Sequence, residues 1–214
     1  MRLLPPLLAL LLLLTGCGRD GSTDTPAATT TSVPSTSTSN ASPQLDADTP
    51  LSAEGVGPVK AGMTLAEVRE AGGRELVVEG FADFEGFCWF GHFQGLKEDF
   101  ALLFLAPERT SPVSNPDEGV LGRVSVESQL NSSPARTEAG VGVGSTKAEV
   151  LKAYADDVVE VTPHRYTEGG EYIDVSGSQD PVPTLLRFET DTDDKVTSIH
   201  GGLSDAARLV EGCA

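Results

Sequence analysis

A glycine-rich stretch, AGVGVGSTKAEVLKAY at residues 139–154, could in principle bind a phosphate. A loop of this kind uses backbone N–H groups and a helix N-terminus to hold the anion. The P-loop pattern requires Lys directly after its last Gly, but Gly144 is followed by Ser145 and Thr146 before Lys147. The dinucleotide pattern requires a third Gly where Ser145 stands. Both motifs fail by their spacing, so we expect no nucleotide site.

The other residues that could do chemistry also lack the required spacing. The three histidines, His92, His164 and His200, are far apart and do not have the spacing of zinc ligands. Counted from Asp191, the sixth position of a calcium loop is Val196 and not the required Gly. The serine-nucleophile patterns Gly-x-Ser-x-Gly and Ser-x-x-Lys do not occur. We therefore expect no catalytic residue, no metal and no cofactor.

The N-terminal segment has the features of an export signal. Arg2 precedes an apolar run over residues 7–14, which is too short to span a bilayer. The run ends in LTGC at residues 14–17, which resembles the lipobox of bacterial lipoproteins. The resemblance implies a signal peptide over residues 1–16 and a diacylglycerol on Cys17. Two acyl chains anchor a protein stably, so it implies attachment to the outer face of the cell membrane.

The cysteine count then indicates a disulfide. If Cys17 carries lipid, Cys88 and Cys213 are the only remaining thiols, and an oxidising compartment favours their pairing. The bridge would close a loop of about 125 residues, which the chain-entropy model values at roughly 4–5 kcal/mol. Two free thiols or two metal ligands are the alternatives.

The composition changes along the chain. Residues 18–50 are rich in Ser, Thr and Pro and nearly lack hydrophobic side chains, so they cannot bury enough apolar surface to offset their ordering entropy. We expect the lipidated cysteine and a disordered stalk over residues 17–53. The net charge of −17 argues against nucleic acid as a partner. The expected partners are the membrane, through Cys17, and an envelope protein or ligand.

An internal repeat explains the glycines better than a phosphate does. VKAGMTLAEVREA at residues 59–71 and VGVGSTKAEVLKA at residues 141–153 share seven identities in thirteen positions. The matched residues lie at the start of a helical pattern in both copies. We therefore expect a first α+β repeat over residues 54–137 and a second over residues 138–214.

Each copy of the repeat has the pattern of a helix N-terminus. Thr64 and Thr146 are expected N-caps, and Glu67 and Glu149 complete a capping box three residues later. The glycine two residues before each threonine would allow the turn into the helix.

These helix starts resemble those of two bacterial families. The motif GMTLAEV at residues 62–68 is similar to a helix start in the β-lactamase inhibitor protein and in the SmpA/OmlA outer-membrane lipoproteins. The resemblance implies that each repeat is a helix, or helical hairpin, followed by antiparallel strands, with the sheets of tandem copies side by side. The second copy departs from the motif, with Ser145 in place of Met. The repeated Gly-x-Thr helix starts, the paired cysteines and the EGC at residues 211–213 also resemble those of uncharacterised lipoproteins of high-GC Gram-positive bacteria.

Strand patterns follow each expected helix, which predicts an α+β fold in which two tandem helix-then-antiparallel-strands repeats form one sheet-based domain. The expected strands are residues 76–79, 86–93, 99–105 and 121–128 in the first half and 158–162, 172–175, 185–189 and 196–200 in the second. Apolar and polar residues alternate over residues 123–127, which suggests a sheet with one wet face.

The aromatic stretch FADFEGFCWFGHF at residues 81–93 contains the strongest candidate for a contact surface. On a strand, Phe87, Trp89 and Phe93 share one face and Cys88, Phe90 and His92 share the other. One face must meet the core, and the second either packs around the disulfide or is exposed. Because Trp and Phe are frequent at interfaces, Phe87, Trp89 and Phe93 are a possible patch for a partner.

These features favour a non-catalytic, lipid-anchored binding or scaffolding module of the cell envelope, located outside the cytoplasm. The alternatives are an inhibitor of an extracellular enzyme such as a β-lactamase, or a small-ligand carrier or hydrolase that sequence patterns do not reveal.

Overall fold

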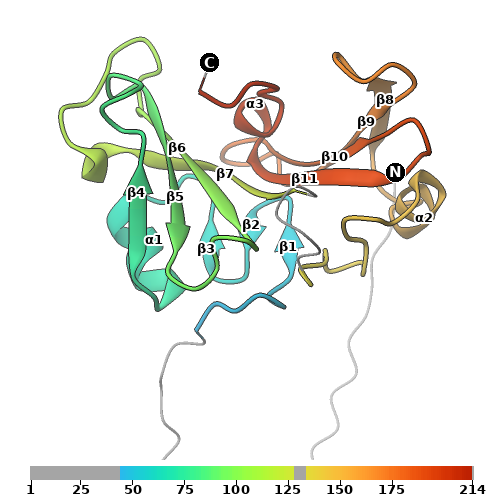
Figure 1. Cartoon of the computed structure of the whole chain (residues 1–214), viewed down its shortest axis with the longest axis horizontal. Coiled ribbons are helices and arrows are strands. Elements are labelled where there is room, and N and C mark those ends of the chain that lie inside the picture. The colour runs from blue at the N-terminus through green and yellow to red at the C-terminus, as the bar shows by residue number, and fades with distance from the viewer. Residues whose placement is uncertain (1–43, 128–133, 214) are drawn as a thin grey trace, which may run out of the picture. The chain divides into compact units, whose positions relative to one another are not determined.

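A computed structural model describes residues 44–127 and 134–213 of the chain (Figure 1). Their main element is an eight-stranded antiparallel sheet in the order β4-β5-β6-β7-β11-β10-β9-β8. Its strands are β4 (Leu76–Glu79), β5 (Cys88–Phe93), β6 (Ala101–Leu105), β7 (Val120–Glu127), β8 (Val159–Pro163), β9 (Glu171–Ser176), β10 (Thr184–Thr190) and β11 (Val196–Leu203). The sheet-based α+β fold is thus confirmed.

Smaller elements cover the two faces of this sheet. They are a three-stranded sheet of β1 (Leu51–Ser52), β2 (Gly55–Val56) and β3 (Val59–Lys60), the helices α1 (Leu65–Gly72), α2 (Lys147–Ala153) and α3 (Ser204–Ala207), and the 3-10 turn η1 (Pro116–Glu118). Figure 1 shows β1–β3 below the large sheet and α3 above it. None of the helices among the described residues is long and apolar enough to cross a membrane.

The large sheet consists of two four-stranded meanders that meet at its centre. β4–β7 follow α1 in the chain and β8–β11 follow α2. The last strands of the two meanders, β7 and β11, pair antiparallel, with Ser125 opposite His200 and Val124 opposite Gly201. Figure 1 shows the two strands side by side.

Both main helices begin at a capping box. Thr64 Oγ1 accepts from the Glu67 N–H at 3.3 Å, and the Thr64 N–H donates to Glu67 Oε2 at 2.7 Å. The same bonds between Thr146 and Glu149 are 3.2 and 2.7 Å long. The backbone hydrogen bond from each threonine lowers the pKa of its glutamate partner. The carboxylates therefore stay ionised beside the positive end of the helix dipole.

The start of each helix is bonded to the last strand of the meander that follows it. The N–H of Leu121, in β7, donates to Met63 O at 2.8 Å, and the N–H of Val196, in β11, donates to Ser145 O at 2.8 Å. These bonds fix the helix start over the sheet in the same way in both halves.

The glycines before the two caps serve this connection. Gly62 and Gly144 have φ values of 86° and 85°, which side-chain-bearing residues rarely adopt. The Gly62 N–H donates to Leu121 O at 2.7 Å and the Gly144 N–H to Val196 O at 2.8 Å. Both groups are therefore committed to the sheet, and the glycine-rich stretch is a turn into a helix.

The main core lies between the large sheet and the face formed by α1, α2 and β1–β3. Its fully buried side chains include Leu65 and Val68 of α1 and Val150 of α2. Leu45 and Leu51 are also buried in it, at 1% exposure each. The folded part therefore begins before residue 53, where the stalk was predicted to end. The few apolar residues of this segment are spaced too widely among polar ones to show a pattern.

The predicted aromatic patch is wrong for two of its three residues. Trp89 and Phe93 have 0% exposure and belong to the main core, where Trp89 stacks on Phe104 at a centroid distance of 6.2 Å. Phe87 lies just before β5 and is 39% exposed. Since β5 is an interior strand of a sheet covered on this face, its aromatic side chains fill the core and are not available to a partner.

The opposite face of β5 packs around the predicted disulfide, which is confirmed. Cys88 and Cys213 are bonded, with their Cα atoms 5.7 Å apart. A second apolar cluster surrounds them, formed by Leu103, Leu105, Ala206 and neighbouring side chains. The disulfide thereby holds the C-terminal segment, residues 204–213, on this face of the sheet.

Candidate functional site

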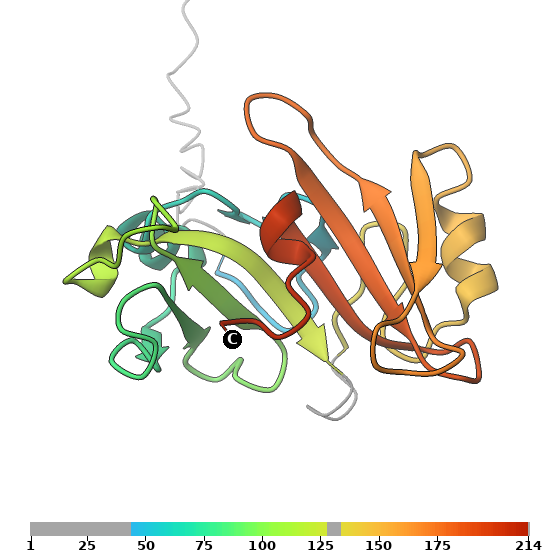
Figure 2. The same ribbon diagram turned by 90° about the horizontal axis from the view of Figure 1, so that it is seen from above.

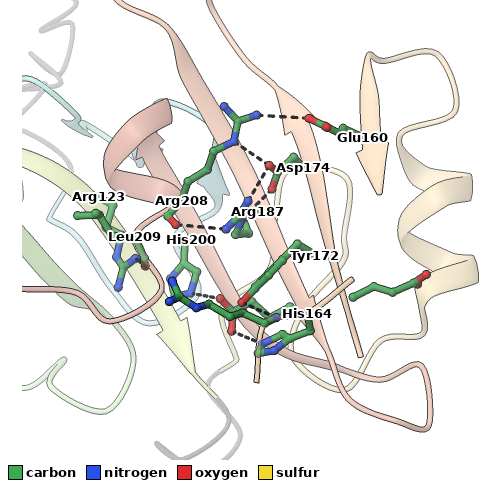
Figure 3. Close-up of polar contacts among 12 residues, drawn as sticks. Arg123, Glu160, His164, Tyr172, Asp174, Arg187, His200, Arg208 and Leu209 are labelled. Atoms are coloured by element: carbon green, nitrogen blue, oxygen red, sulfur yellow. Dashed lines mark hydrogen bonds and ion pairs between the residues drawn. The ribbon is translucent and has the colours of Figure 1, made fainter. Parts of the chain in front are cut away.

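The second meander and the adjoining strand β7 carry polar side chains on the face that points away from the main core. One row crosses five adjacent strands, because the register places Ser125, His200, Arg187, Asp174 and Glu160 in line. A neighbouring row consists of Glu127, Ser198, Glu189, Tyr172 and Thr162. We call these two rows the polar face. Figure 3 shows Glu160, Asp174, Arg187, His200 and Tyr172 of these rows on one side of the sheet.

An ion-pair cluster occupies one side of the polar face. Arg187 binds Asp174 with two parallel bonds, Nε to Oδ1 at 2.7 Å and Nη2 to Oδ2 at 2.9 Å. Arg208 Nε donates to the same Asp174 Oδ2 at 2.9 Å. The Arg187 guanidinium also lies 4.3 Å from the centroid of the Tyr172 ring. Because Arg187 and Asp174 are almost fully buried, the removal of Asp174 would leave the charge of Arg187 buried without its partner.

The other side of the polar face centres on Glu189. Its Oε2 lies 3.3 Å from His164 Nε2 and its Oε1 lies 3.4 Å from His200 Nε2. Burial alone would raise the pKa of Glu189, but hydrogen bonds and charge from His200, with hydrogen bonds from Ser198 and His164, outweigh it and lower the pKa to about 2. Burial lowers the pKa of His200, against the opposing effect of Glu189. A charged carboxylate between two imidazoles results.

The backbone fixes the tautomer of His164. Its Nδ1 accepts from the N–H groups of Tyr166 at 3.1 Å and Thr167 at 3.0 Å. Nδ1 therefore carries no proton, and the hydrogen-bond network places the proton on Nε2, facing Glu189. The ring also stacks on Tyr172 at a centroid distance of 4.4 Å. His164 is thus a structural donor that orients Glu189.

Ser125, His200 and Glu189 lie in the order of a nucleophile, a base and an acid. Ser125 Oγ is 2.8 Å from His200 Nδ1, and the other ring nitrogen faces Glu189. However, Ser125 is only 3% exposed and His200 only 4%, because both belong to central strands beneath the C-terminal segment. Both side chains are therefore buried in this structure, and the contacts among the three residues link β7, β11 and β10.

Two arginines hold the C-terminal segment over the polar face. Arg123 Nη1 donates to Leu209 O at 2.5 Å and to Ala206 O at 3.3 Å. Arg187 Nη1 donates to Arg208 O at 3.3 Å. Burial lowers the pKa of Arg123, whose Nε has no hydrogen-bond partner within residues 44–127 and 134–213. The charges on this face therefore serve to bind the segment that covers it.

A polar pocket of about 290 Å³ remains beside the C-terminal segment. It is lined by Arg123, Glu127, Glu189, His200 and Val210, among other residues. Among the described residues, no three His, Cys, Asp or Glu side chains are placed to hold a metal ion. The oxygens of Glu189 are bonded to both histidines, while the remaining lining includes Glu127 and Arg123, whose Nε has no partner among the described residues.

A second and larger cavity is an open groove of about 610 Å³ on another part of the molecule. Its lining is mainly apolar and includes Met63, Val182 and Leu203. Charged residues at its edge are Glu54, Lys60, Glu67 and Asp180. We call this cavity the apolar groove. It lies where the start of α1, in the first half, meets the loop between β9 and β10, in the second half.

One wall of the apolar groove is the loop between β9 and β10, which is held in place by hydrogen bonds to other parts of the fold. Figure 2 shows the β9–β10 loop projecting beyond the sheet. Glu54, in the turn between β1 and β2, accepts from the Ser178 N–H at 3.3 Å and from the Thr184 hydroxyl at 3.4 Å. The Ser204 N–H donates to Pro183 O at 2.9 Å, which ties the loop to the end of β11.

The structure places the residues singled out in the sequence in different parts of the molecule. Thr64, Glu67, Thr146 and Glu149 are helix caps, and of these only Glu67 lines the apolar groove. Cys17, the predicted lipidation site, lies outside the described residues.

Sequence reasoning missed the polar face. The alternation at residues 123–127 predicted a wet face, yet Arg123 and Ser125 are buried. His164 and His200, which looked isolated in the sequence, bind the same carboxylate. Only the pairing register could have revealed this, since Glu189 lies 25 residues from His164.

In comparisons with known proteins, no protein-family model, no curated protein and no solved structure matches the chain.

Proposed function

We propose that this protein is a non-catalytic binding module, attached by a lipid on Cys17 to the outer face of the cell membrane. One contrast carries the proposal. The titratable side chains that the fold gathers bind one another beneath the C-terminal segment, whereas the open groove is lined by apolar side chains such as Met63 and Val182. Apolar, concave surfaces with a few polar groups are typical of binding sites.

We also propose that the module arose from two copies of one helix-then-strands unit. The two capping boxes and the bonds from Leu121 to Met63 and from Val196 to Ser145 support this, since they are the same in both halves. The apolar groove then lies at a junction that a single copy could not form. This explains why a duplicated unit could gain a binding site that neither copy has alone.

The location is tested by cell fractionation of the full-length protein and a Cys17→Ser variant. The unmodified protein should sediment with membranes, be digested by protease added to intact cells, and show the mass of a diacylglyceryl group on Cys17. The Cys17→Ser variant should leave the membrane fraction. Membrane association that persists in the variant, or protection from external protease, would refute the proposed anchor.

The binding surface is tested by a photo-crosslinking amino acid placed at two exposed positions. Val182 lines the apolar groove and is 51% exposed, while Tyr166 lies at the opposite end of β9, beside the polar face, and is 58% exposed. On intact cells, Val182 should give a defined adduct that added purified protein competes away, and Tyr166 should not. Equal labelling from both positions, or labelling from Tyr166 alone, would exclude the groove as the binding surface.

A further inference from the structure

We infer that the apolar groove binds a segment of a partner protein in which an apolar side chain is flanked by Lys or Arg. This inference rests on the proposed binding function and names the chemistry of the partner. Three features carry it: the shape of the groove, its apolar floor and the charge at its edge.

The floor of the groove offers a seat for one or two apolar side chains. Met63 and Leu203 are half-buried there, and Val182 is exposed beside them. Methionine side chains are flexible and polarizable, so Met63 can adapt to different apolar groups. An apolar anchor that enters such a pocket commonly supplies most of the binding free energy of an interface.

The edge of the groove is acidic. Glu54, Glu67 and Asp180 line it, against the single cation Lys60. An adjoining hollow shares Met63 and Glu67 with the groove and adds Glu70. A cationic flank on the partner would therefore be attracted, and an acidic one repelled. The excess of negative charge over the whole chain, −17, acts in the same direction at longer range.

The shape and charge of the groove argue for a peptide and against a lipid. An acyl chain requires an enclosed apolar cavity, whereas this groove is open to solvent and its lining includes the exposed residues Glu67 and Val182. The headgroups of anionic lipids would meet the acidic edge of the groove and be repelled. A protein segment that carries Lys or Arg needs no enclosed cavity and would not be repelled by the acidic edge.

The test uses the Met63 methyl group as a reporter. The chain has two methionines, Met1 and Met63, so ¹³C-methyl-methionine labelling of the full chain gives at most two signals. A Met63→Leu variant assigns the one in the groove. Three blocked hexapeptides are titrated: two leucines flanked on both sides by two lysines, by two glutamates or by two serines. The lysine peptide should shift the Met63 signal saturably, and the glutamate peptide should not.

Matched charge variants test the acidic edge. Glu67→Gln removes a carboxylate from the groove but keeps a residue that completes a capping box. Glu149→Gln makes the same change at the equivalent cap in the second half, away from the groove. Glu67→Gln and Asp180→Asn should each weaken binding of the lysine peptide about two- to fivefold, as expected for exposed charge pairs, while Glu149→Gln should leave it unchanged.

Each outcome separates this inference from the proposed function. Equal binding of all three peptides would overturn the charge selectivity but leave the groove as an apolar binding site. Weakening by Glu149→Gln equal to that by Glu67→Gln would assign the effect to net charge and also overturn it. The absence of any Met63 shift would refute a cationic-apolar partner. The anchor and the cross-link from Val182 are measured independently of all three peptides.

Discussion

The two halves of the large sheet are built alike on the face toward the main core and differently on the opposite face. On that outer face, the first half has Cys88, Leu103 and Leu105 in an apolar cluster closed by the disulfide. The second half has instead most of the polar face, with its ion pairs, the buried His200 and the partly buried His164. The same C-terminal segment covers both. A shared framework thus permits two chemically unrelated ways of holding one segment.

The comparison also shows which buried side chains of the fold depend on an oppositely charged neighbour. When an apolar cluster loses one methyl group, the free energy of unfolding decreases in proportion to the buried apolar area that is lost. A buried ion pair does not, because the loss of one member leaves the other charged and unsolvated. The second half should therefore be more sensitive than the first to single substitutions on its outer face.

The largest effect is expected from removal of the disulfide. Replacing both Cys88 and Cys213 by Ser should lower the free energy of unfolding by roughly 4–5 kcal/mol, because the bridge closes a loop of about 125 residues. Urea denaturation of the purified protein measures the change. The Cys17→Ser variant is the control and should unfold like the unmodified protein. A loss below about 1 kcal/mol would show that the charged contacts of the second half hold the C-terminal segment unaided.

Breaking the buried ion pair should cost nearly as much. Asp174→Leu leaves the Arg187 guanidinium buried without its carboxylate, and we expect a loss of about 3–5 kcal/mol. Asp117→Asn is the matched control, since Asp117 pairs with Arg69 at 2.9 Å where both side chains are about half exposed. That substitution should change the stability by less than about 1 kcal/mol. Similar losses in both variants would contradict the role assigned to burial.

Acid should weaken the second half in two stages. The pKa of His200 is lowered by burial, so the unfolded chain binds a proton more readily and stability declines as the pH falls below about 6.5. The pKa of Glu189 is lowered to about 2, so this residue stabilises the folded protein at pH values above the ordinary glutamate pKa. That stabilisation is lost as the pH falls toward 2. Denaturation curves between pH 7 and pH 3 should show both declines, and Glu189→Gln should remove the second. A Glu189→Gln variant with the unchanged pH profile would count against this account.

The helix caps should give the smallest effect and the same one in both halves. Thr64→Ala and Thr146→Ala each remove one hydrogen bond from a helix N-terminus, and each should cost about 1 kcal/mol. Differential scanning calorimetry of the two variants measures the difference. Losses that differ by more than about 1 kcal/mol would show that the two helix starts are equivalent in geometry but not in energy.

Local signals in the sequence predicted much of this fold. The eight strands of the large sheet lie within about three residues of their expected positions, because each has an apolar pattern and most are bounded by turn residues. The capping pattern at Thr64 and Thr146 also marked where each helix begins. By contrast, the strands β1–β3 have only two residues each, which is too short for any periodicity.

The candidate sites were harder to predict, because they depend on contacts between distant segments. The bond of His164 and His200 to Glu189 requires the register of four strands, β8 to β11. The apolar groove joins Met63 to Val182, which lie in different halves of the chain. Sequence patterns describe neither of these juxtapositions, and in the sequence the buried Trp89 looked like a better contact residue than the exposed Val182.

The central claim is that the apolar groove acts on a partner while the polar face only maintains the fold. Cross-linking from Val182 on intact cells, repeated in a Met63→Asp and a Ser125→Ala background, tests this claim most directly. We expect Met63→Asp to abolish the adduct, because a charge enters the apolar floor, and Ser125→Ala to leave it in place. An adduct that survives Met63→Asp but disappears with Ser125→Ala would contradict the account and place the function on the polar face.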